Sequence, residues 1–308
     1  MPLVGFISLI GRHTLVRVVK PVMARFSLLL IAFGLAFAGW EGQAAAETVF
    51  KLNFTSTPSS QFGVGAATFA REVAMRSQER YRIELHPEDG LGAPREAIEK
   101  TQLGAIELNL TSTGPFATFV PATQVFDIPF LFRDYAHARA VLDGPIGRQV
   151  LAEFPKYGLI GLAWGENGFR HLTNNVRPIV TPDDIRGLKI RTMQNAIFVR
   201  AFTAYGARPI PIAFPELYAA LRDHVVDGEE NPIPLLVSAR LAEVQKYLSL
   251  TAHVYSPAPF IMSALAWETL SEADRRMFVA AAEAGRDAMR AEVDRMEKEG
   301  STSCAPPA

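Results

Sequence analysis

Residues 187–232 read GLKIRTMQNAIFVRAFTAYGARPIPIAFPELYAALRDHVVDGEENP, and this stretch decides the fold class. A short apolar strand pattern ends on Arg191, and a polar turn, an amphipathic helix, a second strand and a second helix follow. Open α/β sheets bind ligands at the carboxyl ends of their strands, where Arg191 would lie. A guanidinium there can hold a carboxylate or phosphate through two parallel hydrogen bonds. No nucleophile or metal motif lies near it in sequence, which favours capture of a small anion over chemistry on it.

The composition is that of a globular protein. The chain has 308 residues, of which 49% are hydrophobic and 20% charged, enough for about two domains. Its net charge of −1 argues against a nucleic acid partner, because phosphate backbones favour a basic excess. Cys304 is the single cysteine, so neither an intramolecular disulfide nor a thiolate metal site can form. The histidines follow no metal-ligand spacing, and we expect no cofactor.

Residues 1–46 are expected to form a secretory signal peptide. Basic residues precede the apolar run SLLLIAFGLAFAGW at 27–40, and no acidic residue occurs before or within this run. Ala44–Ala46 supplies small residues for cleavage, which predicts a mature N-terminus at Glu47 and a periplasmic location. An uncleaved anchor is the alternative, although a bilayer span takes ~20 residues. A more ordinary signal begins at Met23, which suggests that translation starts there.

Two successive α/β units follow and predict a mostly parallel sheet with flanking helices. In the first unit, helices are expected after the turn at 58–60 and from Arg95. Its strands are expected at residues 48–54, 81–86 and 105–110. The second unit runs from about Leu159 to Val254. Two such units suggest two lobes with a ligand cleft between them.

A long amphipathic helix is expected from Ser271 to Glu299. An N-cap serine and acidic residues in the first turn mark its start, and an apolar stripe follows at helical spacing. Gly285 lies inside it at a cost of about 1 kcal/mol relative to alanine. Gly300 is expected to end the helix.

The 187–232 segment resembles the solute-binding subunit of TRAP transporters, the tripartite ATP-independent periplasmic family. The matching motifs are GLKIR (187–191), Gly-Ala (206–207), PIAFPELYAAL (211–221), VVDGEENP (225–232), ENGFRHLTNNVRPI (166–179), LG (91–92) and FDIPFLF (126–132). The resemblance covers residues 48–299. It implies an α/β, two-lobed periplasmic-binding-protein fold with crossover strands and a long helix spanning both lobes. Lobe I would comprise residues 47–167 with 257–296, and lobe II residues 168–256 with 297–308.

The same resemblance implies a function. The protein would be no enzyme but a monomeric periplasmic binder that delivers a small carboxylate to the small and large membrane permease subunits. C4-dicarboxylates, sugar acids and 2-oxo or hydroxy acids are the expected ligands. One alternative is a periplasmic receptor that presents the acid to a sensor kinase. Another is a hydrolase of small anions, for which the sequence offers no nucleophile–base pair.

The resemblance also assigns ligand contacts in lobe II. Arg191 would form the main salt bridge to the ligand carboxylate, and Asn231 would donate to the same group. Arg170 would supply a second cationic contact. Its alternative role is an ion pair with Glu166 or Asp183.

Further candidates line both predicted lobes. Phe214 would press against the carbon skeleton of the ligand, although aromatic residues more often fill a core. Gln194 and Asn195 are interpreted as readers of ligand hydroxyls or as caps of the helix that follows them. In lobe I, contacts are expected from residues 55–60 and 112–113, which include Thr55 and Ser112.

The sequence departs from the family in three places. The acids that contact the sugar in sialic-acid binders are absent at Pro94 and Ser112, which argues against sialic acid. Glu229 stands where many members have glutamine and is interpreted as an exposed acid in a loop. Family members continue beyond the long helix, so the end at Ala308 suggests a truncation that exposes an apolar face of lobe II.

Overall fold

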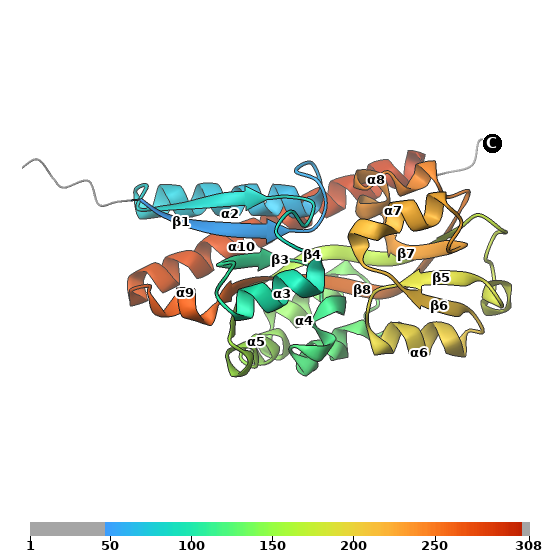
Figure 1. Cartoon of the computed structure of the whole chain (residues 1–308), viewed down its shortest axis with the longest axis horizontal. Coiled ribbons are helices and arrows are strands. Elements are labelled where there is room, and N and C mark those ends of the chain that lie inside the picture. The colour runs from blue at the N-terminus through green and yellow to red at the C-terminus, as the bar shows by residue number, and fades with distance from the viewer. Residues whose placement is uncertain (1–46, 304–308) are drawn as a thin grey trace, which may run out of the picture. The chain divides into compact units, whose positions relative to one another are not determined.

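The computed structural model describes residues 47–303, so the predicted signal peptide and Cys304 lie outside the described residues. The described residues form a mixed eight-stranded sheet in the order β2-β1-β3-β8-β4-β7-β5-β6 (Figure 1). The strands are β1 (Thr48–Phe54), β2 (Tyr81–His86), β3 (Leu108–Leu110), β4 (Leu159–Asn174), β5 (Lys189–Thr192), β6 (Arg208–Pro211), β7 (Gly228–Pro232) and β8 (Tyr247–Ser263).

The two ends of this sheet are parallel and its centre is antiparallel. Strands β2, β1 and β3 pair in parallel at one end, which we call lobe I. Strands β7, β5 and β6 pair in parallel at the other end, which we call lobe II. The long strands β4 and β8 run antiparallel to each other and to their neighbours, and they join the two lobes. The crossover strands are confirmed. The expected parallel pairing holds within each end of the sheet, but β4 and β8 pair antiparallel in its centre.

Helices cover both faces of the sheet. They are α2 (Gln61–Ser77), α3 (Pro94–Gln102), α4 (Tyr135–Asp143), α5 (Pro145–Leu151), α6 (Ala196–Ala204), α7 (Phe214–Arg222), α8 (Ile233–Ser238), α9 (Ala264–Glu268) and α10 (Glu272–Ser303). In lobe II, α6 and α7 lie on opposite sides of β5 and β6 (Figure 1). Ser60 begins α2 as its N-cap, because its side chain accepts from the Gly63 amide.

The long helix α10 contacts α2 in lobe I and α8 beside lobe II, as expected for a helix that spans both lobes. It continues to Ser303 rather than ending at Gly300, because a glycine weakens a helix without blocking its hydrogen bonds. Gly285 lies where α10 meets α2. A Cβ at Gly285 would lie 3.0 Å from the carbonyl oxygen of Gly65 and 3.0 Å from Phe260 Cζ. This glycine therefore allows close contact between the two helices.

The core is divided along the sheet. In lobe I, aromatic side chains such as Phe50, Phe69 and Phe278 pack between β1, α2 and α10. In lobe II, Ile190 and Phe202 belong to the core under α6. Fully burying side chains of this size contributes about 1.5–3 kcal/mol each. Several apolar side chains on the lobe II half of the chain remain exposed, namely Val176, Val180, Val225, Val237 and Leu250.

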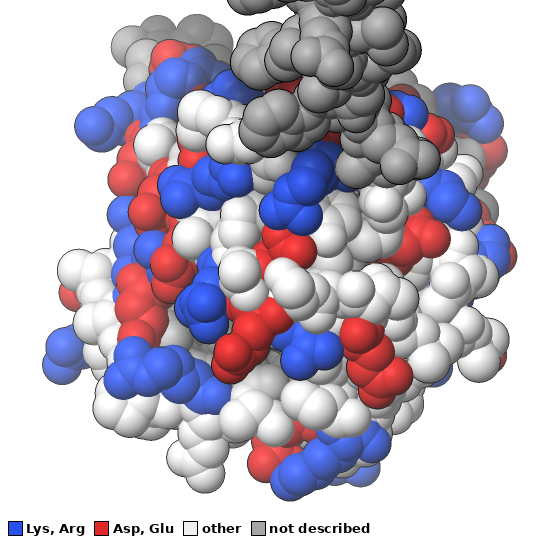
Figure 2. Space-filling model, turned by 90° about the vertical axis from the view of Figure 1, so that its left-hand side faces the viewer, with Lys and Arg blue, Asp and Glu red and all other residues white. Residues whose placement is uncertain are grey.

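The surface mixes charges of both signs. On the face in Figure 2, lysines and arginines are interspersed with aspartates and glutamates, in keeping with 31 basic and 32 acidic residues. Ion pairs such as Arg286–Asp287 contribute to this pattern. Within residues 47–303, none of the helices is both long and apolar enough to cross a membrane.

Candidate ligand site

A pocket lies where strand ends of the two lobes meet, and its volume is about 470 Å³ when the space open to solvent is included. Thr55 follows β1 and Ser112 follows β3, whereas Arg191 and Asn231 lie in β5 and β7. The carboxyl ends of parallel strands from both lobes thus converge here, as the binding rule for open sheets predicts. The lining residues are Thr55, Phe62, Pro94, Arg95, Thr111, Ser112, Pro115, Asn167, Arg191, Met193, Gln194, Ile212, Ala213, Phe214, Asn231 and Leu235.

Arg191 places a buried charge in the wall of this pocket. Its side chain is 2% exposed, and Nε donates to the carbonyl oxygen of Ile212 at 2.9 Å. Nη1 is buried and finds no hydrogen-bond partner among residues 47–303, and no carboxylate of that range forms a salt bridge with Arg191. Burial lowers the pKa of Arg191 to about 10, although Glu230 and Glu229 oppose this effect. The guanidinium remains protonated at neutral pH, and none of the described residues supplies a counterion within hydrogen-bond distance.

Arg170 is also buried, but it is paired and does not line the pocket. Its Nε donates to Glu230 Oε2 at 2.5 Å, and its Nη2 donates to Glu230 Oε1 and to Asn231 Oδ1, both at 2.9 Å. His253 Nε2 lies 3.3 Å from the same Oε2 atom. Burial would raise the pKa of Glu230, but Arg170 and His253 lower it overall. Arg170 therefore holds β4 to β7 and supports Asn231 from behind the pocket.

The alternative ion pairs considered for Arg170 are wrong. Glu166 accepts from Arg139 instead, at 2.5 Å from Nη2, and Asp183 pairs with Arg186 at 2.9 Å. Distance along the sequence could not identify the true partner, Glu230. The antiparallel register of β4 and β7 sets Arg170 opposite Pro232, which lies two residues from Glu230.

The acidic stretch before Pro232 is the buried strand β7 and no exposed loop. Glu229 is 0% exposed, because β7 lies inside the sheet between β4 and β5. Its Oε1 accepts from Thr173 Oγ1 at 3.0 Å, and its Oε2 accepts from Asn231 Nδ2 at 2.5 Å. Burial, with the nearby charge of Glu230, raises the pKa of Glu229 to about 7. The interpretation of Glu229 as a surface acid is therefore wrong.

Asn231 and Phe214 both line the pocket. Arg170 donates to the Asn231 Oδ1 atom, which fixes the orientation of the amide, and one hydrogen of Nδ2 is used by Glu229. The second Nδ2 hydrogen is left for the pocket. Phe214 opens α7 and also packs against core residues of both lobes. It combines the core and lining roles that the sequence left open.

The neighbours Gln194 and Asn195 have different surroundings. Gln194 is exposed and lines the pocket. Asn195 lies behind the lining as the N-cap of α6, where its Oδ1 accepts from the Ile197 amide at 2.8 Å. Its Nδ2 donates to Asp127 Oδ2 at 2.7 Å and to the carbonyl oxygen of Gly114 at 3.0 Å. The geometry therefore gives Asn195 the capping role.

The lobe I wall carries three hydroxyl groups. Thr55 Oγ1 donates to Asp89 Oδ1 at 3.1 Å and lies 2.9 Å from Thr111 Oγ1. Ser112 Oγ donates to Met193 Sδ at 3.6 Å. Of these groups, the sequence pointed to Thr55 and Ser112 but missed Thr111.

Other lining residues were also missed. Arg95 lies at the start of α3, and its guanidinium is 5.2 Å from the ring centroid of Phe119. Asn167 lies in the matched motif at residues 166–179, which is a signal that could have pointed to it, whereas Met193 lies two residues beyond the GLKIR motif at 187–191.

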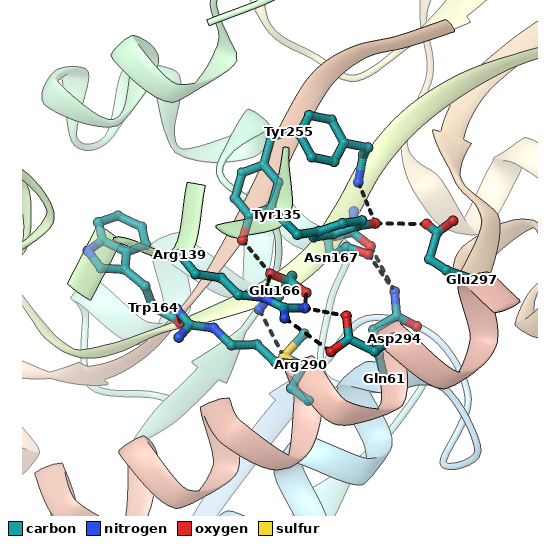
Figure 3. A network of polar contacts seen from close by, with 12 residues as sticks. Gln61, Tyr135, Arg139, Trp164, Glu166, Asn167, Tyr255, Arg290, Asp294 and Glu297 are labelled. Carbon is teal, nitrogen blue, oxygen red and sulfur yellow. Dashed lines mark hydrogen bonds and ion pairs between the residues drawn. The ribbon is translucent and has the colours of Figure 1, made fainter. Parts of the chain in front are cut away.

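A network of polar contacts braces the crossover strands behind Asn167 (Figure 3). Gln61 Nε2 donates to Asn167 Oδ1 at 2.9 Å. The buried Glu166 accepts from Arg139 and, at 2.7 Å, from the Tyr255 hydroxyl. Tyr135 donates to Glu297 and Arg139 to Asp294, both on α10. The network joins α4, β4, β8 and α10 beside a register shift between Glu166 and Gly168, and so fixes the strand that presents Asn167.

The described part of the chain contains no group of three or more histidine, cysteine, aspartate or glutamate residues that could hold a metal ion. The pocket joins a cation in one wall to hydroxyl groups in the other. This arrangement suits a small anion with polar substituents.

Comparison with known proteins agrees with this chemistry. Residues 53–305 match the model of the DctP family, described as bacterial extracellular solute-binding protein, family 7. A solute-binding protein of Verminephrobacter eiseniae is 46% identical over 257 residues, which cover 83% of this chain and 77% of the relative.

Two solved structures are similar throughout the fold. A TRAP periplasmic solute-binding protein from Polaromonas, bound to D-erythronate, has a TM-score of 0.83 and 51% identity, over 84% of this chain and 85% of its own. A Bordetella protein of the same kind, with density interpreted as pantoate, has a TM-score of 0.82 and 49% identity, over 84% and 86%. Members of this family are periplasmic transport proteins that bind small acids, and they are not enzymes. The chain belongs to the DctP family, the solute-binding proteins of TRAP transporters.

Proposed function

We propose that this protein captures a small organic acid in the periplasm through a salt bridge between Arg191 and the ligand carboxylate. The observation that carries the proposal is the buried guanidinium, which lines the pocket without a carboxylate partner among the described residues. Burying a charge is costly unless it is paired, so a ligand carboxylate would supply the missing partner. C4-dicarboxylates, sugar acids and 2-oxo or hydroxy acids all carry this group.

Binding would close the cleft. In the proposed division, residues 47–167 with 257–296 form one lobe, and residues 168–256 with 297–308 form the other. Because the pocket draws Thr55 and Arg191 from different lobes, a ligand that contacts both binds the closed state better and favours closure. A micromolar complex requires about −8 kcal/mol. Two charged hydrogen bonds at ~1.5–3 kcal/mol each would supply a large part of it.

The loaded protein would then deliver its acid to the small and large permease subunits of a TRAP transporter. Export would precede this step, with cleavage before Glu47, because an apolar run and three alanines precede that residue. N-terminal sequencing of the exported protein tests the cleavage site. Uptake of the acid by vesicles that contain the permease, with and without this protein, tests delivery.

The anchor is tested by calorimetry on ligand-free protein obtained by unfolding and refolding. An acid found by a thermal-shift screen should bind Arg191→Met about 100-fold more weakly or worse, since two charged hydrogen bonds are lost. Arg208→Met is the matched control, because Arg208 is exposed on the adjacent strand β6. Unchanged affinity in Arg191→Met would remove Arg191 as the anchor.

A further inference from the structure

The two walls of the pocket offer opposite hydrogen-bonding groups. In lobe II, Arg191 Nη1 and the second Nδ2 hydrogen of Asn231 are donors. An arginine has no acceptor, and Arg170 already occupies one of the two lone pairs of Asn231 Oδ1. This wall therefore suits a carboxylate. The hydroxyl groups of lobe I could in principle act as donors or acceptors.

The direction of the lobe I hydrogen bonds follows from Asp89. An ionised carboxylate only accepts, so the single hydrogen of Thr55 is donated to Asp89 Oδ1. Thr111 lies 2.9 Å away and must then donate its own hydrogen to Thr55 Oγ1. Both hydroxyl hydrogens are used within the wall. Thr55 and Thr111 are left with lone pairs for a ligand, and lone pairs attract a hydroxyl group but repel a carboxylate.

Backbone hydrogen bonds fix the position of Asp89. The Asp89 amide donates to the carbonyl oxygen of Phe54 at 3.1 Å, and the Glu88 amide donates to that of Ser56 at 2.8 Å. Ser56, Glu88 and Asp89 have positive φ values of 72°, 56° and 56°. Such backbone strain is concentrated at functional sites.

Asp89 also fits its surroundings poorly as a purely structural residue. It is 7% exposed, and its Oδ2 has no hydrogen-bond partner in the part of the chain that the structure describes. Burial raises the pKa of Asp89 to about 7, although hydrogen bonding by the side chains of Thr55 and Asn53 opposes this rise, so the ionised form is disfavoured in the folded protein. An asparagine would avoid the buried charge, but its amide could turn either its oxygen or its nitrogen toward Thr55, so it would not fix the direction of this hydrogen bond. The carboxylate is therefore explained better by what it does to Thr55.

We propose that Asp89 is a positioning residue which orients Thr55 and Thr111 as acceptors, so that the pocket selects hydroxylated monocarboxylic acids over dicarboxylic acids. The inference rests on the proposed function, in which Arg191 holds the carboxylate. The hydroxyl groups at the other end of the ligand then donate to lobe I.

Arg95 is the feature that opposes this selection, because a guanidinium in lobe I attracts a second carboxylate. It is only partly buried and packs on Phe119, so solvent screens its charge more than that of Arg191. The hydroxyl pair is fully enclosed, since Thr55 is 5% and Thr111 1% exposed. The enclosed groups should therefore decide the selection.

Three acids of equal chain length test the proposal: erythronate, succinate and butanoate. Calorimetry at pH 8, where Asp89 is ionised, should give wild-type affinity for erythronate about tenfold or more above that for the other two. In Asp89→Asn the amide can donate to Thr55, which frees the Thr55 hydrogen for the ligand. The ratio of erythronate to succinate affinity should fall by about tenfold. Glu88→Gln removes the adjacent exposed carboxylate and should keep the wild-type ratio.

Selectivity is the deciding measurement, because a merely structural role would lower the affinity for all acids alike. An unchanged ratio in a cooperatively folding Asp89→Asn overturns the proposal, as does wild-type affinity for succinate equal to that for erythronate. If Asp89→Asn does not fold, Thr55→Val removes the same acceptor and must lower the same ratio. Arg191-dependent succinate binding would leave the proposed function standing, whereas failure to bind any carboxylate in a broad screen would contradict both.

Discussion

Arg170 and Arg191 are two buried arginines with opposite surroundings. Arg170 is held by the carboxylate of Glu230, whereas the only acceptor that Arg191 reaches within residues 47–303 is a carbonyl oxygen. Each has an Nη1 without a partner among the described residues, so the difference lies in the carboxylate and not in one unsatisfied atom. The comparison teaches that burial alone does not identify a binding charge. A charge that the fold has already paired supports structure, and one left without a counterion is available to a ligand.

The largest expected effect is the loss of protein stability on substitution of the paired arginine, Arg170. Arg170→Met would leave Glu230 buried without its partner and should lower the free energy of unfolding of ligand-free protein by about 3–5 kcal/mol. Arg191→Met removes a buried charge and leaves no carboxylate of the described residues without a salt-bridge partner, although the carbonyl oxygen of Ile212 loses one hydrogen bond. Its unfolding free energy should stay within about 1 kcal/mol of the wild type. Urea denaturation of the two refolded variants measures both values.

The double variant Arg170→Met/Glu230→Met controls for lost volume. It should recover part of the stability, because no charge is left without a partner. If Arg191→Met were as unstable as Arg170→Met, the distinction between the two arginines would fail. Arg191 would then be a structural residue.

The second prediction concerns Glu229, whose charge acts on Arg191 together with that of Glu230. Its pKa is raised to about 7 from 4.5, so the folded protein binds its proton more tightly than the unfolded chain does. The resulting stability is fully present below about pH 4.5 and is lost as the pH rises through 7. Glu229→Gln should therefore raise the unfolding free energy at pH 8 by about 1–3 kcal/mol. Denaturation at pH 6 and 8 measures the change.

The same substitution should strengthen acid binding at pH 8, because it removes a negative charge that competes with the ligand for Arg191. Asp89 and Asp127 also have a pKa of about 7, so part of the pH dependence of stability should remain in Glu229→Gln. Weaker binding at pH 8 in Glu229→Gln would mean that Glu229 orients Asn231 more than it opposes the ligand.

The sequence predicted the strand–helix order around Arg191 because apolar periodicity reports burial, and burial follows secondary structure. It could not predict strand direction in the centre of the sheet. Strands β4 and β8 are buried over long continuous runs, and such runs look alike in parallel and antiparallel sheets.

Side-chain partners were predicted less well than elements. The motif around residues 166–179 located Arg170, but the register that brings Glu230 to it is a property of the folded sheet. The same holds for Asp89, which reaches Thr55 through backbone pairing with residues far away in the sequence. The burial of an acidic side chain depends on the groups that pair with it in the folded protein, and the sequence does not show those pairs. Glu229 was therefore interpreted as a surface residue.

The smallest expected effects separate Gln194 from Asn195. Asn195→Ala removes an N-cap and should lower the unfolding free energy by about 0.5–2 kcal/mol, with little effect on affinity. Gln194→Ala should leave stability unchanged and weaken acid binding by up to about 1 kcal/mol, because its exposed amide faces the pocket. Denaturation and calorimetry on both variants measure the two pairs of values. The contrary result would be an affinity loss in Asn195→Ala and a stability loss in Gln194→Ala. Hydrogen bonding within the fold would then fail to separate structural residues from binding residues, even for adjacent side chains. The contrast between Arg170 and Arg191 could not be extended to other residues.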